Sequence, residues 1–209
     1  KNCYVDLKET CLRSETTVKV FDQMRKLQGF TDEGSPGRDW NVATGMVIEG
    51  KAGFQIMGDW AKGEFTAAGK VPGVDYYCAA TPSNNGYLYN VDSFIFYKTS
   101  DPDKQEGQKL LAKLMMGKNF QKVFNLYKGS IPARLDVPMD EFDKCAKTSN
   151  SDIKTAGASG GLVPSFAHGM AQGNTMKAAL QDVITEHFNS DMSSVDAANA
   201  LADSVLDNM

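Results

Sequence analysis

Apolar residues recur every three positions between residues 14 and 28, and this spacing predicts an amphipathic helix. Ser14 suits the N-cap of that helix, and Gly29 suits its end, because glycine tolerates the backbone that follows a helix. The apolar positions of its buried face are Val18, Phe21, Met24 and Leu27. The pattern therefore predicts an early helix that needs a partner surface.

Apolar positions with similar spacing predict further helices along the chain. One begins at the N-cap Asp39 and ends near Gly50, and Ser193 with Asp196 resembles a capping box at the start of the last one. The other predicted helices cover residues 60–68, 103–115, 119–127 and 176–188, and the last one covers 195–205. Helices thus account for most of the predicted structure.

Three short apolar segments, at residues 54–57, 76–80 and 91–97, predict strands. Apart from Asp92 and Ser93, residues 91–97 carry apolar side chains on both faces of the predicted strand. Both faces are therefore expected to be buried. Short strands that alternate with helices indicate a layered α/β fold. These strands are few for a self-contained sheet.

The charged residues argue against two classes of partner. The net charge of −4 comes from 22 lysines and arginines against 26 aspartates and glutamates, with no long basic run. Nucleic acid and anionic membranes both require clustered positive charge. No apolar stretch approaches the roughly 20 residues that cross a bilayer. The chain opens with Lys1 and shows no signal peptide, so we expect it to be processed or cut from something longer.

Four cysteines, Cys3, Cys11, Cys78 and Cys145, permit three fully paired connectivities. None of them forms a C-x-x-C pair, which argues against a zinc ribbon or a thioredoxin-like motif. An even number of cysteines fits an oxidising compartment, although buried cytosolic thiols would look the same.

Signals of an enzyme are absent from the sequence. His168 and His187 are the only histidines, so a metal site with several histidines is excluded within this chain. No P-loop, dinucleotide-binding turn or nucleophile elbow is present. We therefore expect no catalytic residue, no metal and no cofactor. His187 falls near the end of a predicted helix, where it is expected to interact with the helix dipole.

Five residues stand out for their side-chain chemistry. Trp40 and Trp60 each follow an acidic residue at a loop or strand end, and an indole face suits the C–H face of a sugar. Each tryptophan alone would more often be packing. Asp92 in a buried strand must be paired or face a polar cavity. Lys128 closes a helix, where it would interact with the helix dipole, and His168 with Ser165 supplies the strongly polar side chains of an apolar loop.

Four segments carry a resemblance to a known family. Gly50–Trp60 (GKAGFQIMGDW) resembles the signature of periplasmic solute-binding proteins that feed ABC sugar importers. Asn90–Phe94 (NVDSF), Leu126–Arg134 (LYKGSIPAR) and Val163–Gly169 (VPSFAHG) are similar to its glucose/mannose-binding subgroup. The order and spacing of these segments match over essentially the whole chain, which makes the resemblance specific.

The resemblance implies a role for each candidate residue. Trp40 and Trp60 would line the pocket, with Trp60 the stacking platform, and Asp92 would accept hydrogen bonds from sugar hydroxyls. Lys128 would donate to a hydroxyl or ring oxygen, and His168 would contact the sugar from the second wall. Cys78 and Cys145 also fall where the subgroup has cysteines, which implies a disulfide between them. Cys3 and Cys11 have no counterpart in it.

Members of this family are about twice as long, with a sugar held between two lobes. The resemblance therefore implies a type II periplasmic-binding-protein-like fold, represented here by its C-terminal half. Residues 1–80 and 133–209 would belong to the C-terminal lobe, and residues 81–132 would cross into the N-terminal lobe. A second chain or segment would supply the missing half.

The expected function is extracytoplasmic binding of a glucose-like aldohexose for delivery to the membrane permease of an ABC importer. Two alternatives stay open. One is a carbohydrate-active α/β enzyme in which Asp92 and another carboxylate act as acid and base. The other is the same binding fold serving chemoreceptor signalling.

Overall fold

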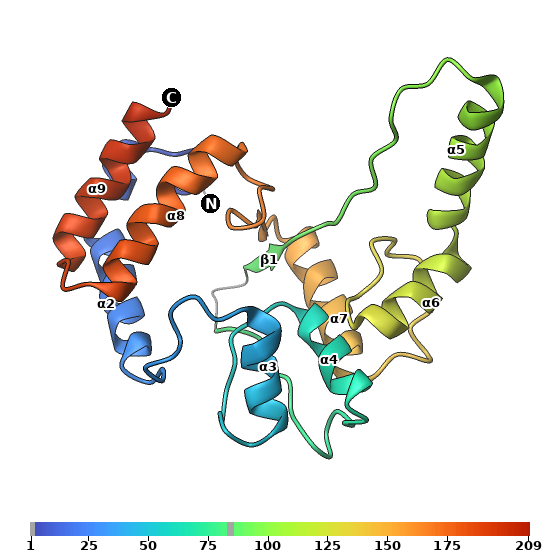
Figure 1. Ribbon diagram of the computed structural model, residues 1–209, viewed down its shortest axis with the longest axis horizontal. Coiled ribbons are helices and arrows are strands. Elements are labelled where there is room, and N and C mark those ends of the chain that lie inside the picture. Colours follow the sequence, from blue (N-terminus) through green and yellow to red (C-terminus); the bar gives the residue numbers. More distant parts are fainter. Residues whose placement is uncertain (1–2, 83–85) are drawn as a thin grey trace. The chain divides into compact units, whose positions relative to one another are not determined.

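The computed structural model of the protein describes residues 3–82 and 86–209 (Figure 1). Contacts within the chain divide it into two compact units. Unit 1 comprises Lys1–Gly37, Leu88–Asn90 and Val163–Met209, whereas unit 2 comprises Arg38–Tyr87 and Val91–Leu162. Each unit is therefore assembled from segments that are distant in the sequence.

Helices form the core of unit 1. They are α1 (Glu9–Leu12), α2 (Glu15–Gln28), α8 (Asn174–Asn189) and α9 (Ser194–Asp207). α9 contacts the three others, and its alanines let the helices approach closely. The buried side chains of this core are Leu12, Phe21, Met176, Leu180, Val183, Ala197, Ala198, Leu201, Ala202 and Val205.

The predicted helix ends in unit 1 agree with the structure. α2 begins after Ser14 and ends before Gly29, although the Ser14 side chain makes no hydrogen bond to the helix. The backbone N–H of Asp196 donates to Ser193 Oγ over 3.1 Å at the start of α9. The predicted cap of the last helix is therefore confirmed.

Unit 2 contains shorter helices and a smaller core. Its helices are α3 (Trp40–Ile48), the 3₁₀ turn η1 (Asp59–Ala61), α4 (Lys62–Ala67), α5 (Pro102–Met115), α6 (Lys118–Lys128) and α7 (Lys144–Ala158). Val137, Phe142 and Ala146 form a buried cluster with partly buried neighbours. Four helices predicted in this region, from the one that starts after Asp39 to the one that ends near residue 127, are confirmed.

Two long-range links join α4 and the segment after it to α7. Lys62, 6% exposed, pairs through Nζ with Asp143 Oδ2 at 2.7 Å, and Asp143 also caps α7. A disulfide joins Cys78 to Cys145, the pair that the resemblance implied. Its loop of 67 residues stabilises the fold by about 4 kcal/mol if the effect is loss of chain entropy. In unit 1, a second disulfide joins Cys3 to Cys11.

Two short strands, β1 (Tyr87–Tyr89) and β2 (Leu162–Pro164), pair with each other. The Tyr87 N–H donates to the Gly161 carbonyl over 3.0 Å, and the Ser165 N–H donates to the Tyr89 carbonyl over 2.8 Å. The bonds advance in the same direction along both segments, so the pairing is parallel. The chain passes from one unit to the other within these strands.

The three predicted strands are wrong for this structure. Residues 54–57 and 91–97 form no ladder within the described residues, and Tyr76 makes only an isolated bridge with Pro72. Burial of both faces of residues 91–97 is also wrong, since Ile95 is 80% and Tyr97 82% exposed. A strand requires a neighbour to accept and donate its backbone hydrogen bonds, and the described residues supply none for these segments.

Helix α7 escaped sequence analysis because it has no apolar stripe. Its buried positions are Ala146, Asn150 and Ala156, which are small or polar. The stretch is anchored instead by Asp143 at its N-cap and by the disulfide at Cys145.

Across the described ranges, no helix has both the length and the apolar run that a membrane crossing needs.

His187 lies in the core of unit 1 rather than at an exposed helix end. It follows Met176, Leu180 and Val183 on the buried face of α8 and is 0% exposed, with its ring 4.7 Å from that of Phe21. Neither ring nitrogen has a hydrogen-bond partner within the described residues. His187 does lie in the last turn of α8, as predicted, and its complete burial was not predicted. Burial lowers the pKa of His187, and the charge of Arg25 lowers it further, whereas Asp22 opposes the shift.

We predict that the stability of unit 1 falls at acid pH because of His187. The unfolded chain binds a proton near pH 6.5, whereas the folded ring resists protonation, so the unfolded state gains protons first. The free energy of unfolding is unaffected by His187 above about pH 6.5. Below that pH it falls by up to about 1.4 kcal/mol per pH unit, until the pH reaches the lowered pKa of the folded ring. Urea unfolding between about pH 5 and 8 measures this slope.

The substitution His187→Leu should flatten the slope, because it removes the buried ring that resists protonation. Equal slopes in the wild type and His187→Leu would contradict the assignment.

Candidate functional site

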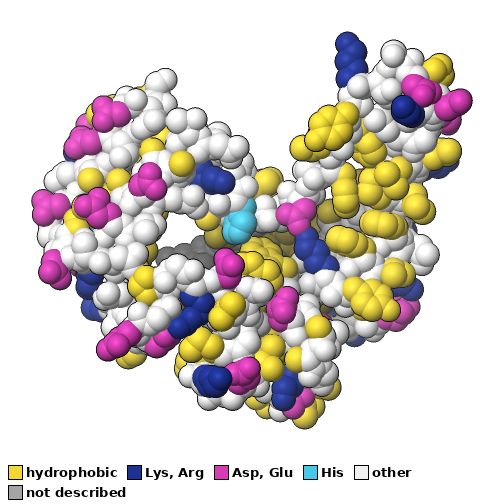
Figure 2. Space-filling view, in the orientation of Figure 1, with side chains coloured by type: hydrophobic (Ala, Val, Ile, Leu, Met, Phe, Trp, Pro, Cys, Tyr) yellow, Lys and Arg dark blue, Asp and Glu magenta, His cyan; other side chains and the backbone are white. Residues whose placement is uncertain are grey.

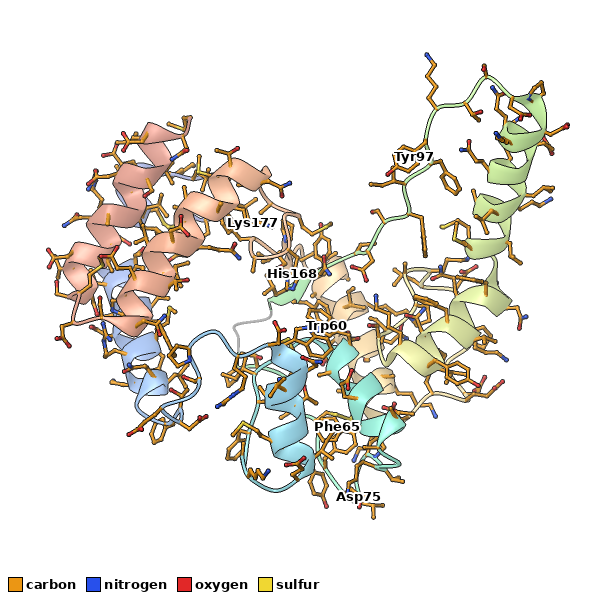
Figure 3. The ribbon with its side chains drawn as sticks, in the orientation of Figure 1. Trp60, Phe65, Asp75, Tyr97, His168 and Lys177 are labelled. Atoms are coloured by element: carbon orange, nitrogen blue, oxygen red, sulfur yellow. A yellow bond between two sulfur atoms is a disulfide. The ribbon has the colours of Figure 1, made fainter. Side chains whose placement is uncertain are left out.

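The candidate binding residues fall in both units. Trp40, Trp60, Asp92 and Lys128 belong to unit 2, and His168 belongs to unit 1 (Figure 3 labels Trp60 and His168). Each group is therefore described within its own unit.

The structure brings Asp92 and Lys128 together as an ion pair. Lys128 is the last residue of α6, and its ammonium lies 5.7 Å from the centre of the Phe124 ring, one turn earlier on the same helix. The Asp92 side chain is 63% exposed and that of Lys128 is 29% exposed. Predicted burial of Asp92 is wrong because its segment is not a strand. A pairing was one of the two predicted environments of Asp92, but Lys128 was not predicted as the partner, because that depends on tertiary structure.

Trp60 is held at the turn that precedes α4. It lies in η1 and is partly buried, and its indole packs directly on the backbone of Gly58. A Cβ atom added at Gly58 would lie 2.1 Å from the Trp60 ring. Only glycine leaves this space for the indole, which explains the Gly-Asp-Trp sequence in physical terms.

The residue between them, Asp59, was not assigned a role by sequence analysis. Its Oδ2 accepts the backbone N–H of Ile131 over 3.0 Å. Burial raises the pKa of the Asp59 carboxyl, while the hydrogen bond from Ile131 and the charge of Lys62 oppose that shift. No local sequence signal could have found this role, because the Ile131 donor lies 72 positions away in the sequence.

Trp40 occupies the first position of α3 and is 40% exposed. Its carbonyl oxygen accepts from Thr44 Oγ1 and from Gln55 Nε2, each over 2.9 Å. Thr44 Oγ1 also lies 2.8 Å from Gln55 Oε1, so its single proton is shared between the two acceptor oxygens. These bonds tie the segment after α3 to the start of that helix and leave the Trp40 indole at the surface.

His168 is exposed in the loop after β2, and its Nδ1 lies 2.7 Å from Ser165 Oγ. Ser165 is 3% exposed, and its backbone N–H donates to the Tyr89 carbonyl. Gly169, with φ of 70°, completes a turn that the Met170 N–H closes by donating to the Ser165 carbonyl. The buried serine therefore orients the imidazole, a role that sequence analysis missed.

The candidate residues of unit 2 suit a neutral polyhydroxylated ligand. The Asp92 carboxylate offers acceptors, the Lys128 ammonium offers donors, and the indoles of Trp40 and Trp60 offer flat apolar faces. In unit 1, His168 offers a polar ring of its own. Among the described residues, no three His, Cys, Asp or Glu side chains are grouped to hold a metal ion.

Sequence comparison decides the family. Residues 4–154 match the model of the family described as bacterial extracellular solute-binding protein. The chain belongs to this family. Its α/β solute-binding fold agrees with the helices and strands described above. The family is one of binding proteins that are not enzymes, in agreement with the absence of catalytic motifs.

Relatives of this solute-binding chain match almost all of it. A protein of Brucella suis named "probable sugar-binding periplasmic protein" is 46% identical over 206 residues, which are 98% of this chain and 49% of that protein. A Rhizobium meliloti protein of the same name is 43% identical, over 98% of this chain and 50% of its own length. An uncharacterized ABC transporter extracellular-binding protein of Pyrococcus horikoshii is 31% identical, over 85% of this chain and 39% of its own. The chain spans about half the length of these relatives or less.

We predict that Ser165 fixes the orientation of the His168 ring. A serine hydroxyl can donate to Nδ1 or accept from it, so the contact holds the ring in place with either tautomer. The substitution Ser165→Ala should release the ring, which would be visible as changed ¹H and ¹⁵N chemical shifts of the His168 imidazole. The buried His187 ring serves as the internal control and should not change. Unaltered His168 shifts in the variant would refute the orientation by Ser165.

Proposed function

We propose that this chain is the C-terminal half of a periplasmic protein, called the intact protein below, that binds a glucose-like aldohexose for an ABC importer. The observation that carries the proposal is the match of 98% of the chain to a relative named "probable sugar-binding periplasmic protein". The name of the Pyrococcus horikoshii relative supports a membrane permease as the partner. The preference for glucose over mannose or galactose rests on the resemblance of four sequence segments.

The geometry of unit 2 supports sugar binding. Asp92 and Lys128 place a carboxylate and an ammonium side by side, and such a pair can accept from and donate to hydroxyl groups of one sugar ring. Because the two charged groups already hold each other, less rearrangement is needed when the sugar arrives. Trp60 supplies an apolar face from the same unit. His168 of unit 1 is proposed to contact the sugar from a second wall.

Exposed apolar side chains support a missing half. They lie on residues 91–127, inside the segment 81–132 that we assign to the N-terminal lobe. Yellow apolar side chains gather over α5 and α6 (Figure 2). Exposed members include Phe94, Ile95, Tyr97, Leu110, Leu114, Val123 and Tyr127. An apolar surface of this extent is typical of a region covered by another part of the protein, and we propose the absent N-terminal half as its cover.

Residues 1–80 and 133–209 remain our proposed parts of the C-terminal lobe. Closure of the two lobes would be a hinge motion that sugar contacts from both lobes stabilise. In this proposal the sugar is bound and released unchanged.

We predict that Trp60→Ala weakens sugar binding by the intact protein by roughly 2–4 kcal/mol, the range for a buried aromatic anchor. Titration calorimetry with D-glucose measures the affinity, and chromatography of the recovered sugar tests whether it is unchanged. Tyr77→Ala removes another exposed aromatic ring of unit 2 and is the matched control, with no expected loss. Loss of affinity in the control but not in Trp60→Ala would overturn the site assignment, and conversion of the sugar would overturn the function.

A further inference from the structure

The turn that carries Trp60 and the loop that follows Lys128 meet in unit 2. Asp59 Oδ2 accepts the N–H of Ile131 over 3.0 Å, and the Ser130 side chain also hydrogen-bonds to Asp59. The bonded residues are 72 positions apart in sequence. Asp59 immediately precedes Trp60, and Ser130 and Ile131 follow Lys128 by two and three residues. One carboxylate therefore connects the backbones beside two of the proposed sugar-binding side chains.

Backbone packing holds the same two segments in contact. A Cβ atom added at Gly63, near the start of α4, would lie 2.8 Å from the Lys128 carbonyl oxygen. A Cβ atom added at Gly129 would lie 2.5 Å from the Gly63 nitrogen. Gly129 also ends α6 with φ of 89°, a conformation that favours glycine. Both positions require glycine, so the end of α6 meets the start of α4 without intervening side chains. Gly129 lies three residues before position 132, where the chain leaves the proposed N-terminal lobe, so this contact lies beside the proposed hinge and is compatible with closure.

The two lysines near Asp59 each form an ion pair with another carboxylate. Lys62 pairs with Asp143, and Lys128 pairs with Asp92. Asp59 is thus held by donors from the 129–131 loop, with these two lysines contributing through their charge. A partly buried carboxylate loses hydration, which is costly unless hydrogen bonds satisfy it, and for Asp59 the 129–131 loop supplies them.

We infer that Asp59 is a positioning residue for sugar binding, which sets the spacing between the Trp60 indole and the Lys128 ammonium. The consequence for affinity rests on the proposed function, whereas the geometric link does not. An asparagine at this position retains an acceptor for the Ile131 N–H, and alanine retains none. The Asp59→Asn variant should therefore keep the Ile131 hydrogen bond and most of the sugar affinity, both of which the Asp59→Ala variant should lose.

The first experiment needs no sugar. In the 209-residue chain, Asp59→Ala should speed amide hydrogen exchange of Ile131 at least about tenfold, because its acceptor is gone. It should also shift the Trp60 indole resonance and leave that of Trp40 in place, while Asp59→Asn stays close to the wild type. Unchanged exchange at Ile131 together with an unchanged Trp60 resonance would overturn the inference.

Asp75→Ala provides the matched control. Asp75 Oδ2 accepts the Val71 N–H over 2.7 Å in the same unit, well away from Trp60 (Figure 3). This variant loses a carboxylate-to-amide bond of the same kind and should leave Ile131 and Trp60 unaffected. If Asp59→Ala does not fold, Ser130→Ala removes one of the two hydrogen bonds and should move the Trp60 resonance in the same direction, and an unmoved resonance would then reject the inference.

The second experiment measures glucose binding by the intact protein with calorimetry. Asp59→Ala should bind at least about tenfold more weakly, a loss of the size expected for one positioned hydrogen bond. Asp59→Asn should stay within about threefold, and Asp75→Ala should match the wild type. Wild-type affinity in Asp59→Ala would reject the positioning role and leave the proposed function standing. If the wild type binds no sugar, the proposed function fails, and the exchange experiment still decides the role of Asp59.

Discussion

Backbone hydrogen bonding is the constraint on which this structure depends. A helix satisfies its backbone groups within its own segment, whereas a strand must find a neighbour. In the described residues, α2, α8 and α9 form their backbone hydrogen bonds within each helix and bury apolar side chains against one another. In unit 2, the apolar segment 91–97 has no neighbouring strand, and its side chains remain exposed. The difference follows from which partner segments this chain contains.

The proposed site is assembled from short polar links that fix side chains one at a time. Asp92 holds Lys128, Ser165 holds His168, and Asp59 ties the turn of Trp60 to the loop beyond α6. Such links fix orientation before a ligand arrives, and preorganisation of this kind reduces the entropy lost on binding. A binding protein for a neutral sugar depends on such orientation because it lacks a strong charge–charge attraction to its ligand.

Sequence alone predicted the helices with clear apolar stripes, from α2 to α9, because local spacing and caps determine them. It failed for α7, whose buried positions are small or polar, and for the strands, whose formation depends on distant partners. The burial of His187 was not predicted, because it follows from the packing of α8 against the other helices of unit 1. The five candidate residues came from sequence motifs, but the Asp92–Lys128 pair and the role of Asp59 required the tertiary structure.

The central claim is that sugar binding needs contacts from both lobes of a protein about twice as long as this chain. Titration calorimetry with D-glucose, on the 209-residue chain and on the intact protein under the same conditions, tests it most directly. We expect the intact protein to bind and the chain alone to bind at least about 100-fold more weakly, since half-exposed hydroxyl partners keep their water. Equal affinity of the two forms would contradict the account.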